Sequence, residues 1–253
     1  MKVVILAGGF GTRLAEYTDV LPKPMVTIGG MPIVWHIMKH YAKYGFNDFV
    51  LALGYKADVV KSYFLNFNSL SSDFTVNLAS GKVVWHRADA PEWNISLIDT
   101  GLDSLTGTRI KKLSPLLEEE KFMLTYGDGV SDVPIDKLID FHSSHGKIAT
   151  MTAVRPTARF GELEVSGISV TSFQEKPQLH GGWINGGFFV FDREFLDLIP
   201  AENVMLERDP LEKASLLGEL MAFQHDGFWH CMDTKRDKEV LDQMWVSGTA
   251  PWA

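Results

Sequence analysis

The chain has 253 residues, of which 45% are hydrophobic and 22% charged, and this is enough to bury a sizeable core as one or two domains. A formal net charge of -8 and a pI near 5.5 argue against a nucleic-acid-binding surface, which is usually basic, although a local pocket can still be positive. The single cysteine and the lack of any membrane-spanning or signal-like segment lead us to expect a cytoplasmic protein that binds neither nucleic acid nor membrane.

The first half of the chain alternates apolar runs typical of strands with segments whose apolar residues recur at helical spacing. The predicted strands are Val3–Leu6, Phe49–Leu53 and Phe122–Thr125, the predicted helices are Pro32–Tyr44, Ala57–Phe64 and Ile135–His145, and Phe74–Leu78 pairs with Val83–His86 in a predicted hairpin. Because strands alternating with helices favour a parallel sheet covered on both faces, we predict an α/β protein.

The second half is richer in strands. Its predicted strands are Ala149–Val154, Gly161–Val165, Ile168–Gln174 and Trp183–Phe191, and its predicted helices are Glu194–Ile199, Asp209–Leu217 and Lys235–Val246. No repeat, low-complexity tract or proline-serine linker separates the two halves, so we expect one unit.

A glycine-rich turn, Leu6–Leu14, follows the first predicted strand directly. Glycines let backbone amides approach an anion closely, and Arg13 and Lys23 would add cationic donors to it. The turn lacks the Gly-Lys-Ser/Thr ending of a Walker A loop, and Leu14 stands where a dinucleotide fingerprint has its third glycine. The turn is typical of a nucleoside-triphosphate cradle, with an ordinary strand-to-loop turn as the alternative.

Two aspartates stand at the ends of predicted strands. Asp128 follows Phe122–Thr125 and lies between two glycines, and Asp233 precedes the last predicted helix. Because Mg²⁺ commonly binds one or two carboxylates together with substrate phosphates, the pair fits a magnesium site. The alternatives are a turn aspartate for Asp128 and a helix N-cap for Asp233.

The second half holds candidates for a second substrate. Lys176, within Glu175-Lys176-Pro177, is suited to bind another phosphate, or else forms a solvated charge pair. Asn185 precedes two glycines inside an aromatic strand, where glycine marks a bulge or the close approach of a ligand, and its amide can bind hydroxyls. We expect Trp183 and Trp229 in the core rather than beneath a sugar.

Taken together and in this order, these segments resemble the sugar-1-phosphate nucleotidyltransferases. The stretch Asp99–Arg109 and the motifs Phe141-His142, Arg159-Phe160-Gly161 and Gly227-Phe228-Trp229 are similar to the cytidylyl branch of that family. The resemblance implies a Rossmann-like three-layer α/β/α fold with a mixed, mainly parallel sheet and additional strands in the second half. It also implies a single domain over 1–253, with a nucleotide-binding half of about 1–131 and a sugar-phosphate-binding half of about 132–253.

The family's roles carry over to matching positions. The implied catalytic residues are Arg13, Lys23 and Asp128, and Asp128 and Asp233 would hold Mg²⁺. The implied nucleotide-binding residues are Leu6, Ala7, Gly8, Gly9, Gly11, Thr12, Arg13, Lys23, Ser104, Arg109 and Gly127. The implied sugar-phosphate-binding residues are Glu175, Lys176, Asn185 and Gly186. One departure is Leu21, because relatives often carry a lysine before Pro-Lys-Pro.

The resemblance implies transfer of a cytidylyl group from CTP to α-D-glucose 1-phosphate, giving CDP-glucose and pyrophosphate for deoxysugar or surface-polysaccharide synthesis by a homo-oligomer. The same reaction with UTP or dTTP is an alternative. A non-catalytic subunit that senses nucleotide sugars, or a glycosyltransferase, would also need such a pocket. Arg13, Lys23, Asp128, Lys176 and Asp233 together favour the catalyst over the sensor.

Overall fold

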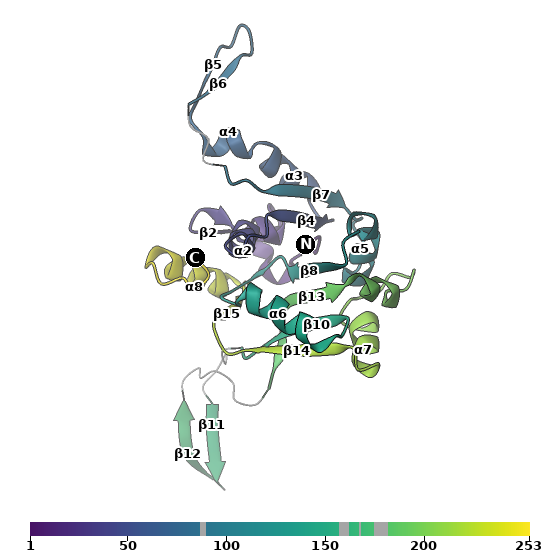
Figure 1. Ribbon diagram of the computed structural model, residues 1–253. Coiled ribbons are helices and arrows are strands. Elements are labelled where there is room, and N and C mark those ends of the chain that lie inside the picture. The colour runs from purple at the N-terminus through teal and green to yellow at the C-terminus, as the bar shows by residue number, and fades with distance from the viewer. Residues whose placement is uncertain (87–89, 157–161, 167, 175–181) are drawn as a thin grey trace.

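A mixed seven-stranded sheet, β14-β10-β13-β8-β1-β4-β7, runs through the centre of the computed structural model, which describes all residues except 87–89, 157–161, 167 and 175–181 (Figure 1). The strands in this order are Leu220–His225, Ala149–Val154, Ile184–Asp192, Lys121–Tyr126, Val3–Ala7, Asp48–Leu53 and Asn94–Asp99. β1, β4, β7 and β8 are parallel, as are β10 and β14, whereas β13 runs antiparallel to both its neighbours. The mixed, mainly parallel sheet predicted from the sequence is therefore confirmed.

Helices cover both faces of the sheet. Successive side chains of a strand point to opposite sides, and the central strands are apolar at successive positions, so both faces have to be buried. Val3, Ile5 and Ala7 of β1 belong to one core, whereas Val4 and Leu6 belong to the other. The first core includes residues of α2 (Ile33–Ala42), α3 (Ala57–Leu65), α6 (Ile135–His145) and α8 (Lys235–Val246). The second includes residues of α5 (Thr106–Lys112), α7 (Asp209–Leu216) and the 3-10 helix η4 (Arg193–Leu198).

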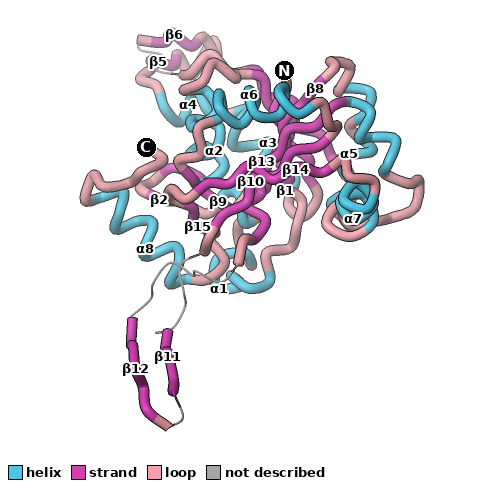
Figure 2. The backbone as a smooth tube through the Cα atoms, turned by 60° about the horizontal axis from the view of Figure 1, so that its bottom comes forward, coloured by secondary structure: helices cyan, strands magenta, loops and turns pink. Residues whose placement is uncertain are grey.

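The remaining elements are short. They are η1 (Thr12–Leu14), α1 (Ala15–Thr18), η2 (Lys23–Met25), α4 (Phe67–Ser71), η3 (Ser114–Leu116) and the strand pairs β2 (Thr27–Ile28) with β3 (Met31–Pro32), β5 (Phe74–Val76) with β6 (Val83–Trp85), β9 (Gly129–Ser131) with β15 (Trp229–Cys231), and β11 (Glu162–Ser166) with β12 (Ser169–Gln174). Hairpin β11–β12 extends away from the sheet in both views, and hairpin β5–β6 does so in Figure 1 (Figures 1 and 2). Within the described residues, no helix is long and apolar enough to cross a membrane.

Several predicted elements have the observed bounds, and others were missed. α6, α8 and β10 match their predictions residue for residue. The helix predicted over Glu194–Ile199 is instead η4, a 3-10 helix. β7 and β14 were not predicted; both are edge strands that are only partly buried, and β7 has polar residues at Asn94, Ser96 and Asp99.

Parallel pairing brings the site together. Leu6 of β1 is in register with Tyr126 of β8, so both strands end at one edge of the sheet. The Gly127 amide also donates a hydrogen bond to the Leu6 carbonyl at 3.0 Å. The glycine-rich turn and Asp128 therefore lie side by side, where open α/β sheets bind ligands.

Candidate active site

A cleft of about 700 Å³ opens at this edge of the sheet. Its wall includes the turn from Leu6 to Thr12, the segment from Leu102 to Thr106, the end of β8, Asn185 of β13 and residues that precede α8. Parts of the chain that are remote in sequence thus face one space large enough for a substrate.

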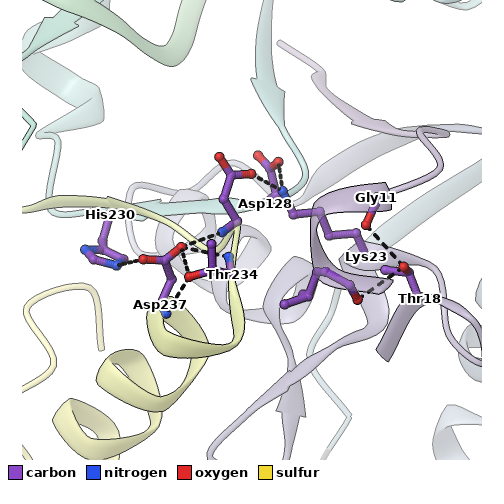
Figure 3. A network of polar contacts seen from close by, with 9 residues as sticks. Gly11, Thr18, Lys23, Asp128, His230, Thr234 and Asp237 are labelled. Atoms are coloured by element: carbon purple, nitrogen blue, oxygen red, sulfur yellow. Dashed lines mark hydrogen bonds and ion pairs between the residues drawn. The ribbon is translucent and has the colours of Figure 1, made fainter. Parts of the chain in front are cut away.

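Lys23 joins the two predicted metal ligands at the base of the cleft. Its ammonium group lies 2.7 Å from Asp128 Oδ2 and 2.6 Å from Asp233 Oδ1 (Figure 3). Lys23 and Asp233 are buried, and the Asp128 side chain is 28% exposed. Burial by itself lowers the pKa of Lys23, but the neighbouring charge of Asp128 and the hydrogen bonds to both aspartates raise that pKa above its ordinary value. Lys23 is therefore a fixed positive charge in this site.

The carboxylates have the chemistry that Mg²⁺ requires. The ligand atoms of Asp128, Cys231 and Asp233 lie within 4.8 Å of one another. Carboxylate oxygens suit this hard cation, whereas the Cys231 thiol is a soft ligand that Mg²⁺ does not favour. The two aspartates, remote in sequence, thus fit a shared magnesium ion with phosphates and water as further ligands.

Asp233 is held in place from the start of α8. The Asp237 carboxylate accepts hydrogen bonds from the backbone amides of Asp233 and Thr234 and from the Thr234 hydroxyl, while Thr234 caps the helix in return (Figure 3). His230 lies 3.4 Å from the other oxygen of Asp237, and burial lowers the pKa of this histidine. The capping box therefore fixes the backbone from which Asp233 projects.

The glycine-rich turn is shaped by Arg109 as well as by space for a ligand. Arg109 is buried, and its guanidinium donates hydrogen bonds to the carbonyls of Gly8, Leu53, Gly101 and Leu102 and to the Thr100 hydroxyl. A Cβ on Gly8 would lie 2.4 Å from this guanidinium, so a larger residue there would displace Arg109 from its hydrogen bonds. Gly11 has φ +63°, and its carbonyl accepts a hydrogen bond from the Thr18 hydroxyl at 3.1 Å (Figure 3).

Most of the predicted site residues face the cleft. Those that line it are Leu6, Ala7, Gly8, Gly9, Gly11, Thr12, Lys23, Ser104, Arg109, Gly127, Asp128, Asn185 and Asp233. Gly186 is not among them; it packs against β10, where an added Cβ would lie 2.7 Å from Val154, and its carbonyl accepts a hydrogen bond from Trp229. Glu175, Lys176 and the side chain of Arg13 lie outside the part of the chain that the structure describes.

Sequence reasoning did not assign every residue that lines the cleft to the site, and the polar or aromatic side chains of Thr106, Tyr126, Glu207 and Trp229 are among those it missed. Tyr126 stands directly before Gly127-Asp128, so its position beside the site could have been inferred. Trp229 was expected in the core, but it is partly exposed and donates its indole N–H to Gly186 at 2.7 Å. Glu207 lies in a loop without a motif, so only the fold reveals it.

Comparisons with known proteins agree with this architecture. The family described as Nucleotidyl transferase matches residues 2–232. The chain is 50% identical to a glucose-1-phosphate cytidylyltransferase of Salmonella typhi, over all of this chain and 98% of that protein. It is 41% identical to a probable glucose-1-phosphate cytidylyltransferase of Bacillus subtilis, over all of this chain and 99% of the relative.

A solved structure has the same fold. The crystal structure of HddC from Yersinia pseudotuberculosis superposes with a TM-score of 0.71 at 25% identity, covering 96% of this chain and 99% of its own. The resemblance to the sugar-1-phosphate nucleotidyltransferases is thereby confirmed over nearly the whole length. On the strength of the family match and of both full-length relatives, the chain belongs to the nucleotidyl transferase family.

Proposed function

We propose that this enzyme transfers the cytidylyl group of CTP to α-D-glucose 1-phosphate, giving CDP-glucose and pyrophosphate. The observation that carries the proposal is the meeting of Lys23, Asp128 and Asp233 beside the glycine-rich turn. The names of the full-length relatives support the choice of CTP and glucose 1-phosphate.

In the reaction, a phosphate oxygen of the sugar phosphate attacks the α-phosphorus of CTP. A new P–O bond forms, the bond from the α-phosphorus to the bridging oxygen breaks, and pyrophosphate leaves with the electron pair. Because the nucleophile is already an anion, no side chain has to remove a proton. The main tasks of the protein are to align two polyanions and to neutralise charge at the reacting centre.

The proposed roles follow the cleft. The amides of Gly8, Gly9 and Gly11 would bind the triphosphate, and Lys23 would contact phosphate oxygens at the reacting centre. Asp128 and Asp233 would hold Mg²⁺, which when bound neutralises phosphate charge. The base would lie toward Ala7, Gly8 and Ser104, and the sugar toward Asn185.

Arg13, Glu175 and Lys176 remain proposed contacts to the phosphates and the sugar, on the family resemblance alone. A direct nucleotide contact by Arg109 likewise stays a prediction, because its donors are directed at protein oxygens here. We further propose that residues 1–253 act as one domain of a cytoplasmic homo-oligomer.

The test is pyrophosphate release from glucose 1-phosphate and Mg²⁺ with CTP, UTP, dTTP or ATP in separate reactions. We expect turnover with CTP to exceed that with the other nucleotides. Activity with UTP or dTTP alone would overturn the cytidylyl assignment, and no activity with any nucleotide would favour the sensing subunit.

A further inference from the structure

A chain of hydrogen bonds crosses the cleft wall from α5 to β13. The Thr106 hydroxyl donates to Glu207 Oε2 at 2.7 Å, and the Tyr126 hydroxyl donates to Glu207 Oε1 at 2.7 Å. The Asn185 amide then donates to the Tyr126 oxygen at 3.0 Å. All four side chains line the cleft, so one carboxylate joins the segment expected to bind the nucleotide to the residue expected to face the sugar.

Glu207 is attached firmly at the α5 end. The loop before α7 satisfies backbone amides in the first turn of α5, because the Val204 carbonyl accepts from Gly107 and Thr108 and the Asn203 side chain accepts from Leu105. A helix leaves its first amides without partners inside the helix, so this loop acts as the cap of α5. A shift of the loop must therefore move the start of the helix with it.

The hydrogen bonds at the β13 end of this chain, formed by Tyr126 and Asn185, are equally well defined. Tyr126 contacts Glu207 through its phenolic hydroxyl, which has a single proton to donate. Because that hydroxyl donates to Glu207, its oxygen is left to accept from the Asn185 amide nitrogen. Asn185 Oδ1 in turn accepts from the Gly187 amide at 2.8 Å, which fixes how the Asn185 amide is turned.

We propose that Glu207 is a positioning residue that couples the nucleotide side of the cleft to the sugar side. The assignment of the two sides rests on the proposed function. An ionised carboxylate is purely an acceptor, so Glu207 holds the two hydroxyls without competing donors of its own. A nucleotide that fixes the position of the start of α5 thereby orders Tyr126 and Asn185 for the sugar phosphate. Conversely, a bound sugar phosphate that orders Tyr126 and Asn185 fixes the start of α5 for the nucleotide.

The test is a mutant cycle in which each substitution removes one hydroxyl. Thr106→Val acts on the nucleotide side and Tyr126→Phe on the sugar side, each alone and in a Glu207→Ala background. We expect Thr106→Val to raise the KM for glucose 1-phosphate, and Tyr126→Phe to raise the KM for CTP, by about tenfold each. In the Glu207→Ala background these effects on the remote substrate should disappear.

Two controls separate coupling from loss of structure. Glu202→Gln alters an exposed carboxylate of the same loop and should leave both KM values unchanged. Glu207→Gln keeps one acceptor oxygen and should retain part of the coupling that Glu207→Ala loses. Effects confined to the adjacent substrate, or remote effects of the same size in the Glu207→Ala background, would overturn the proposal.

Failure of the proposed function has a different signature. Wild-type turnover is measured first. If the enzyme turns over UTP or dTTP but not CTP, the assignment of CTP as the substrate is wrong, and the mutant cycle is then run with the nucleotide that is turned over. If no nucleotide is turned over, the proposed catalytic function is wrong. The coupling is then measured in the same variants from the rise in Tm that CTP or glucose 1-phosphate produces in each of them.

Discussion

Replacing Lys23 with methionine should destabilise the metal-free protein and make its stability depend strongly on Mg²⁺. The change keeps the length of the side chain but removes the positive charge that Lys23 places between Asp128 and Asp233. Removal of one partner from a buried ion pair costs about 3–5 kcal/mol. Since the Asp128 side chain is 28% exposed and partly hydrated, we take the lower end, about 3 kcal/mol. For a chain of this size that corresponds to a fall in Tm of about 6–12 °C.

Thermal melting with and without Mg²⁺ measures the effect. Mg²⁺ should raise the Tm of Lys23→Met more than that of the wild type, because the wild-type carboxylates already have a cation between them. Lys235→Met is the matched control, since that lysine is 56% exposed and only 3.7 Å from Glu16, and such surface pairs contribute little. An unchanged Tm, or equal shifts with Mg²⁺ in both proteins, would refute the reasoning.

Three further predictions follow from individual contacts. Asp128→Asn should lower turnover on the order of 10²–10³-fold in a pyrophosphate-release assay. Asp226→Asn changes an exposed carboxylate and should leave turnover unchanged; similar rates for the two variants would show that Asp128 does not act at the reacting centre. Gly8→Ala should lower Tm because its Cβ meets Arg109, while Gly9→Ala, with open space around it, should not; equal Tm values would show that Arg109 moves aside freely. Burial lowers the pKa of His40 to about 4, so below pH 6.5 the unfolded chain binds a proton that the folded chain resists, and about 3 kcal/mol of stability should be lost as the pH falls to 4. Urea unfolding of His40→Gln across this pH range should show a shallower loss than the wild type, and parallel curves would contradict the assignment.

Local patterns in the sequence were enough to predict which segments meet at the glycine-rich end of the cleft. A few neighbouring residues are enough to indicate the strand Val3–Ala7, the glycine turn after it and the position of Asp128 after a strand. The parallel pairing of β1 with β8 then brings the turn and Asp128 together. The role of Gly8 was only partly visible, because its small size also admits Arg109 from 101 positions further along the chain. Glu207 could not be predicted, since its importance arises from contacts with two other segments.

The charge around the cleft explains why a metal ion and a nucleotide should bind together. Among the described side chains that line it, Lys23 and Arg109 are cationic, whereas Asp103, Asp128, Glu207 and Asp233 are acidic. Arg109 is directed at protein oxygens, and Lys23 is shared between two of the carboxylates. A triphosphate that arrived without a cation would therefore meet net negative charge from these described side chains, and at close range such repulsion is weakly screened. A divalent ion reverses the sign at the base of the cleft and leaves Lys23 able to turn toward phosphate, so Mg²⁺ and CTP are expected to enter as one complex.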